Sequence, residues 1–193
     1  MNRRSLLKIT AFAPLALAHG QLPTTQVAGY QRFRVGDFVG TAFLDGHIQI
    51  GPDAFADLSE EEADALAEAA FLDGGKIKTG VNAYLLQSAD ETILIDAGGA
   101  GAMEPLEGLA ALMEKAEVKP DEVTKILITH FHPDHIGGLL SNGEAVFAKA
   151  SVHIHQADID AWTTQEAVNS APEAFKAVFE LARSVYLAYE DRV

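Results

Sequence analysis

Residues 129–138, THFHPDHIGG, form the most informative segment of this 193-residue chain. The apolar run 126–128 precedes it directly and predicts a buried strand over residues 124–129. Uncompensated imidazoles and carboxylates at the end of a buried strand destabilise a fold without any return. The segment carries four side chains that can bind metal ions: His130, His132, Asp134 and His135. We therefore predict a metal site here.

The spacing of these side chains predicts how they bind. In an extended segment alternate residues share a face, so His130 and His132 together can bind one ion. Pro133 cannot donate a ladder hydrogen bond and predicts a loop. On that loop Asp134 and His135 can turn toward a second ion beside the first. The chain has no cysteine, so both ions would be bound through nitrogen and oxygen atoms.

A resemblance to a known family rests on the same segment. His130–His135, followed by Gly137 and Gly138, resembles the signature of the metallo-β-lactamase superfamily. Asp96–Gly98 resembles the Asp-x-Gly that follows an early strand in that superfamily, and residues 82–85 resemble the strand before it. Residues 36–38, 45–46, 79–81 and 156–162 are similar to the exported methyl-parathion-hydrolase-like branch. The resemblance runs from about Tyr30 to the C-terminus and covers only the front part of that family's domain.

The resemblance implies a fold of the α/β (α+β) class, an αββα sandwich with two zinc ions between its sheets. His130 and His132 would bind one ion, and Asp134 and His135 the other. A hydroxide bridging the ions would attack a small-molecule ester, lactone, β-lactam or phosphotriester. Asp134 would be the catalytic residue that orients the hydroxide and takes up a proton. Asp96 would either hold a ligand in place or cap the turn at its strand end.

The chain departs from the family's pattern in its number of ligands. A catalytic zinc has three protein ligands and a water, whereas this cluster offers two side chains to each ion. The family's other ligands come from later segments that have no match here. We therefore expect residues 30–193 to be the N-terminal half of the domain, truncated at the C-terminus. His153 and His155 share a strand face and are weaker candidates for the missing ligands.

Three interpretations of the function stay open. The chain is a zinc-dependent hydrolase represented by its N-terminal part, or a non-catalytic fragment or pseudoenzyme with a partial metal site. Alternatively, another chain completes the site, which allows a homo-oligomer. The formal net charge of −14 disfavours nucleic acid as a partner, because a surface of this sign repels phosphates.

Residues 1–18 resemble a twin-arginine export signal. Arg3 and Arg4 precede the apolar stretch 9–17, and residues 16–18 offer a small-residue cleavage site. An ordinary secretory signal or an uncleaved anchor is the alternative. We expect residues 19–29 to be a linker and the mature protein to be periplasmic in a bacterium. We expect no stable membrane insertion, because no apolar run is long enough to span a bilayer.

Turn signals and apolar periodicity predict the other elements. Asp45–Gly46 predicts a hairpin turn, with a return strand over residues 47–50. Ser59–Glu62 predicts a capping box, and Ser170–Glu173 a second one before the apolar stripe of Phe175–Tyr189. Strands are predicted over residues 81–86, 92–95 and 152–155, and helices over residues 104–115 and 156–163 and from Ser59 to Gly74–Gly75.

Overall fold

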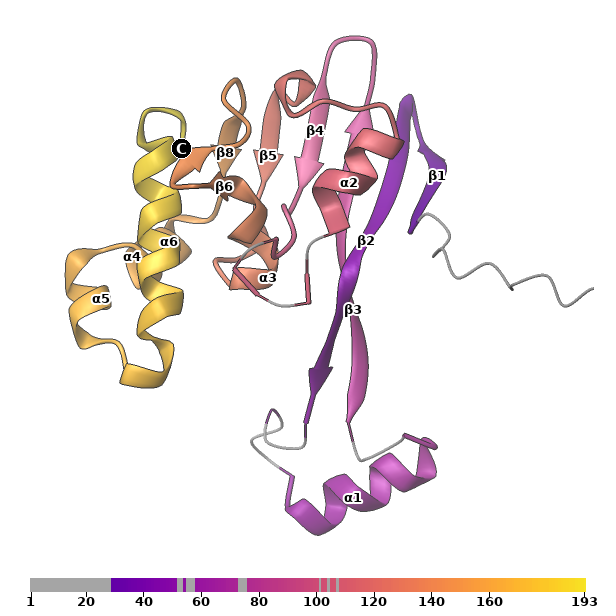
Figure 1. The fold of residues 1–193 in the computed structure, drawn as a ribbon, viewed down its shortest axis with the longest axis vertical. Helices are drawn as coiled ribbons and strands as arrows, with labels where there is room; N and C mark the ends of the chain where they lie inside the picture. Colours follow the sequence, from indigo (N-terminus) through magenta and orange to yellow (C-terminus); the bar gives the residue numbers. More distant parts are fainter. Residues whose placement is uncertain are drawn as a thin grey trace, which may run out of the picture.

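The computed structural model describes residues 29–51, 54, 58–72, 76–100, 102–103, 105–106 and 108–193. Six strands form one sheet in the order β1-β2-β3-β4-β5-β8 (Figure 1). Strands β1 to β4 are antiparallel neighbours, whereas β4, β5 and β8 run parallel. Their bounds are Tyr30–Val35 (β1), Phe38–Ile50 (β2), Ile77–Gln87 (β3), Thr92–Ile95 (β4), Lys125–Leu127 (β5) and Ser151–His153 (β8).

The described residues form six α-helices. They are α1 (Glu60–Ala69), α2 (Gly108–Lys115), α3 (Pro133–Ile136), α4 (Gln156–Trp162), α5 (Gln165–Ser170) and α6 (Lys176–Tyr189). Short 3₁₀ turns cover Pro120–Glu122, Gly137–Leu139, Glu173–Phe175 and Glu190–Arg192, and a small hairpin pairs β6 (Leu140–Ser141) with β7 (Glu144–Ala145). This mixed α/β architecture confirms the predicted fold class.

One face of the sheet packs against helices. Leu85, Leu94 and Ile126 are fully buried and lie side by side on β3, β4 and β5. They belong to one core cluster with side chains of α2 and α6, such as Leu109 and Val185. The described residues therefore form one helix layer on one sheet layer, as expected for the front part of an αββα sandwich. None of the helices in this part of the chain is long and apolar enough to cross a membrane.

The predicted hairpin at Asp45–Gly46 is wrong. Strand β2 continues through these residues to Ile50, and its pairing with β3 shifts register between Leu44 and Gly46. The Asp45 carboxylate is buried and accepts the N–H of Gly99 at 2.9 Å and of Leu109 at 2.7 Å. These two distant bonds fix Asp45 in a bulge rather than a turn. The hairpin turn lies instead at Gly36, whose φ of 57° requires a flexible residue.

Of the two predicted capping boxes, the structure contains one. Ser59 and Glu62 form the predicted box at the start of α1, which confirms it. The box predicted at Ser170 and Glu173 is wrong, because Ser170 is the last residue of α5 and its hydroxyl donates to the carbonyl of Glu166. Helix α6 begins only at Lys176, without a side-chain cap. Other predictions fall outside the described residues, on residues 1–28, Gly74–Gly75 and Glu104.

Candidate metal site

The histidine cluster lies where the parallel strands end. Asp96 follows β4 directly, and Thr129 to His135 follow β5, its parallel neighbour. In open α/β sheets ligands bind beyond the carboxyl ends of parallel strands, because loops there diverge and leave room. The sheet therefore places the predicted ligands at the edge where a binding site is expected.

Three imidazole rings converge at this edge. The ring centroids of His130 and His132 lie 4.5 Å apart, and those of His130 and His135 lie 4.1 Å apart. The rings of His130 and His132 are therefore neighbours, and their joint binding of one ion stays a prediction. The predicted loop after His132 is wrong, because α3 begins at Pro133, whose fixed φ suits the first helical position. Asp134 is therefore held on a helical turn.

Asp96 holds His135 in place. Its Oδ2 lies 2.8 Å from His135 Nδ1, and its Oδ1 accepts the backbone N–H of Thr129 at 2.9 Å. The Thr129 hydroxyl also donates to this carboxylate. Asp96 thus orients the His135 ring and fixes the backbone at Thr129; these partners lie after β5 and not in the turn that follows β4. With Nδ1 engaged, His135 presents Nε2 toward a ligand.

Charge within the cluster is already compensated. His135 Nε2 lies 3.2 Å from Asp134 Oδ2. Although burial lowers the pKa of His135, hydrogen bonds to Asp134 and Asp96 raise this pKa to about 9. The hydrogen bond to His135 lowers the pKa of Asp134, and burial beside the other two histidines lowers the pKa of His130. A proton therefore occupies His135 between two carboxylates, and a metal ion that binds Nε2 must displace it.

Close backbone packing supports the cluster. A side chain at Gly137 or Gly138 would collide with the backbone of Gly99 or Ala97. Ala97 N–H also donates to the His135 carbonyl at 2.8 Å. The two glycines of the motif therefore let α3 approach the Asp96 turn.

Trp162 is a neighbour that the sequence did not reveal. Its ring centroid lies 5.3 Å from that of His132 at an interplanar angle of 84°, an edge-to-face contact. Phe179 of α6 packs behind it at 4.6 Å. The apolar spacing of α6 predicted packing, but no local signal indicated that Trp162 would connect this packing to His132.

His153 and His155 are engaged elsewhere. His155 Nδ1 accepts the N–H of Ala157 at the start of α4, and His153 Nε2 lies 3.0 Å from the Ser151 hydroxyl. Within the described part of the chain, no three histidine, cysteine or acidic side chains are placed so that they could hold one ion. The cluster thus offers nitrogen and oxygen donors of the kind that zinc binds, but it offers two of them to each ion and not three.

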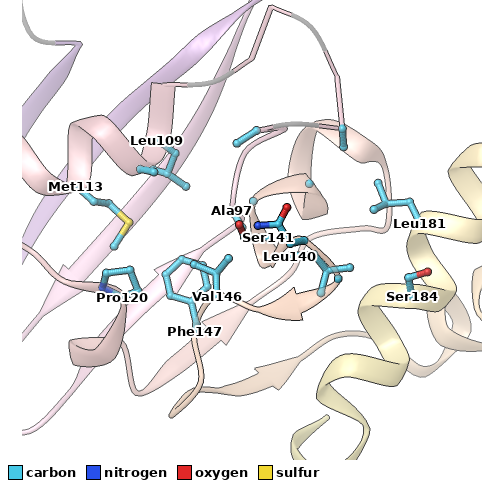
Figure 2. Close-up of a pocket in the computed structure, with 17 residues that line it drawn as sticks. Ala97, Leu109, Met113, Pro120, Leu140, Ser141, Val146, Phe147, Leu181 and Ser184 are labelled. Carbon is cyan, nitrogen blue, oxygen red and sulfur yellow. The ribbon is translucent and has the colours of Figure 1, made fainter.

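A separate cavity of about 710 Å³ lies between α2 and α6 (Figure 2). Its lining is mostly apolar and includes Leu109, Met113, Val146, Phe147 and Leu181. It reaches the backbone of Ala97, next to Asp96, but includes none of the histidines. This cavity is therefore on the helix side of the sheet, apart from the ligand cluster.

The fold and the histidine motif are shared with known proteins. Residues 77–184 match the model of the metallo-beta-lactamase superfamily, and the chain belongs to this superfamily. The chain is similar to the solved "hydrolase AbOPH in beta lactamase superfamily", with 28% identity, a TM-score of 0.76, and coverage of 86% of this chain and 60% of that one. The solved "AidC, a Dizinc Quorum-Quenching Lactonase" has a similar fold, with 23% identity, a TM-score of 0.74 and the same coverage.

Curated relatives match over a shorter stretch. A "Beta-lactamase-like protein 2 homolog" from Drosophila melanogaster is 37% identical over 62 residues, which are 32% of this chain and 20% of that protein. Its counterpart from Caenorhabditis elegans is 29% identical over 77 residues, which are 40% and 25% of the two proteins. The chain thus matches about a quarter or less of these relatives and 60% of the two solved structures.

Proposed function

We propose that this chain provides the metal-binding part of a zinc-dependent hydrolase acting on a small-molecule ester, lactone, β-lactam or phosphotriester. The observation that carries the proposal is the convergence of three imidazoles and two carboxylates beyond β4 and β5. Membership of the superfamily supports it, as does the likeness to a solved hydrolase. Assignment to the exported methyl-parathion-hydrolase-like branch stays a prediction.

In this proposal the ligands act in two pairs. His130 and His132 would hold one ion, because their ring centroids lie 4.5 Å apart. Asp134 and His135 hold the other, with Asp96 fixing the His135 ring from behind. Zinc in such a site supplies a Lewis acid for the carbonyl or phosphoryl group and activates water.

Asp134 has the second task of moving a proton. Its carboxylate accepts a hydrogen bond from His135 Nε2, and its lowered pKa keeps it ionised at neutral pH. If His135 were a metal ligand, Asp134 Oδ2 would lose that partner and would be available to accept a proton from the attacking water.

A partial metal site is the second candidate function. It is favoured by one observation, that no three ligands in the described residues are placed to hold one ion. A chain with such a site binds zinc weakly and does not turn over substrate, unless another chain supplies further ligands.

Metal analysis and activity assays of the same preparations separate the two functions. We expect the wild-type chain to bind zinc and His132→Ala to lose most of it. The matched control His153→Ala should retain zinc, because within the described residues the His153 side chain bonds only to Ser151. Hydrolysis of ester, lactone and phosphotriester substrates with added zinc supports the hydrolase. Zinc binding without turnover supports the partial site, and zinc content that follows His153 contradicts both.

A further inference from the structure

The three histidines of the cluster are not held in the same way. Asp96 Oδ2 lies 2.8 Å from His135 Nδ1. The Thr129 hydroxyl lies 3.1 Å from His130 Nδ1. The His132 ring, in contrast, makes no hydrogen bond to any residue that the structure describes. A ligand that rotates freely binds a metal ion more weakly, because this freedom is lost on binding, so a contact that held the His132 ring would strengthen the site.

The helix that follows His132 does not hold its ring. His132 is the N-cap residue of α3, but its side chain does not cap that helix. His155 is the N-cap residue of α4, and its Nδ1 accepts the backbone N–H of Ala157 at 3.1 Å. The same type of residue at the same position is therefore bound to its own helix in α4, whereas in α3 its ring is left for other contacts.

Trp162 makes such a contact with His132. The two ring centroids lie 5.3 Å apart at an interplanar angle of 84°, the edge-to-face geometry in which aromatic rings attract each other. The other ring beside His132 belongs to His130, which is itself a predicted ligand. The indole nitrogen of Trp162 is only a hydrogen-bond donor, so this side chain can hold the His132 ring without competing for an ion.

Helix α6 fixes the position of Trp162 from the other side. Phe179 packs against the Trp162 ring, with the centroids 4.6 Å apart at an interplanar angle of 31°. One turn further along α6, Arg183 donates to the carbonyl of Thr163, the residue after Trp162, at 2.7 Å. Thr163 is buried, and its hydroxyl donates to the carbonyl of Ile159 in α4. Two contacts with α6 therefore fix the end of α4 that carries the indole ring (Figure 1).

We propose that Trp162 is the positioning residue of His132. It holds this imidazole in one orientation beside His130, as the Asp96 carboxylate does for His135 through a hydrogen bond. Trp162 acts only through His132 and touches no ion or substrate. Its effect on zinc binding rests on the proposed function, whereas its hold on the ring does not.

Zinc titration calorimetry of the full chain tests the effect on the metal site. Trp162→Leu keeps an apolar side chain against Phe179 but removes the aromatic partner of His132, so the zinc dissociation constant should rise about three- to tenfold. Trp162→Phe restores an aromatic ring and should stay within about twofold of wild type. The matched control Tyr30→Leu breaks another aromatic pair, with Phe43, and should also stay within about twofold. Circular dichroism reports whether each variant is folded.

Nuclear magnetic resonance of the zinc-free chain separates positioning from packing. The ring current of Trp162 should displace the ring-proton signals of His132, which are identified by their loss in His132→Ala. Trp162→Leu should move these signals toward those of free histidine, whereas the signals of His135, which Asp96 holds, should keep their positions. If Trp162 only packed α4 against α6, its replacement would lower the melting temperature without this selective movement.

The outcomes distinguish this proposal from the proposed function. In a chain that binds zinc, a folded Trp162→Leu variant that leaves either the zinc affinity or the His132 signals unchanged would overturn the proposal. If the wild-type chain binds no zinc, the proposed function fails, and the His132 signals alone decide whether Trp162 holds the ring. If Trp162→Leu does not fold, Phe179→Leu replaces it, because it lets the indole ring move and should shift the same signals.

Discussion

Replacing Asp45 by alanine should destabilise the whole domain. Asp45 is 5% exposed, and its carboxylate accepts two buried backbone N–H groups, from Gly99 in the turn after β4 and from Leu109 in α2. These bonds join β2, α2 and the Asp96 turn at one point. Alanine leaves both donors buried without an acceptor, which costs about 1–3 kcal/mol each. We expect a loss of about 3 kcal/mol in the free energy of unfolding, because water can enter and recover part of the total.

Urea denaturation followed by circular dichroism measures this loss. With an m-value of about 2 kcal/mol/M, the unfolding midpoint of Asp45→Ala should fall by about 1.5 M. Asp45→Asn keeps one acceptor oxygen and should lose about half as much. Asp90→Ala removes an exposed carboxylate in the turn between β3 and β4, and it should stay within about 0.5 kcal/mol of wild type. An Asp45→Ala midpoint within about 0.2 M of wild type would refute the reasoning.

Three other substitutions test separate parts of the molecule. Asp96→Asn should lower zinc affinity about 10- to 100-fold in titration calorimetry, because it loosens the hold on His135; unchanged affinity would exclude this role. Tyr189→Phe should cost about 1–3 kcal/mol in urea denaturation, because its buried hydroxyl bridges the Phe147 N–H and the Leu139 carbonyl. Tyr186→Phe is the control, and an equal effect of both would count against the bridge. Replacing Arg3–Arg4 by lysines should leave precursor in the cytoplasm if the leader is of the twin-arginine type, whereas normal export would return it to the ordinary secretory class.

The sequence by itself determined the features that are encoded locally. The six-residue histidine motif predicted the superfamily and the cluster, because its ligands are neighbours in the chain and follow a strand. The strand over residues 92–95 was predicted with its observed bounds, since a short apolar run between turn residues favours a buried strand. The capping box at Ser59 was predictable because both of its partners, Ser59 and Glu62, lie within four residues of the sequence.

Only the tertiary structure decided the features that depend on distant partners. Asp45–Gly46 has a turn preference. The hydrogen bonds of Asp45 to Gly99 and Leu109, which are distant in the sequence, outweigh this preference and keep β2 extended. The edge-to-face contact of Trp162 with His132 depends on how α4 and α6 pack, which no local pattern contains. Local propensities differ by only about 1 kcal/mol, so a few buried long-range contacts are enough to override them.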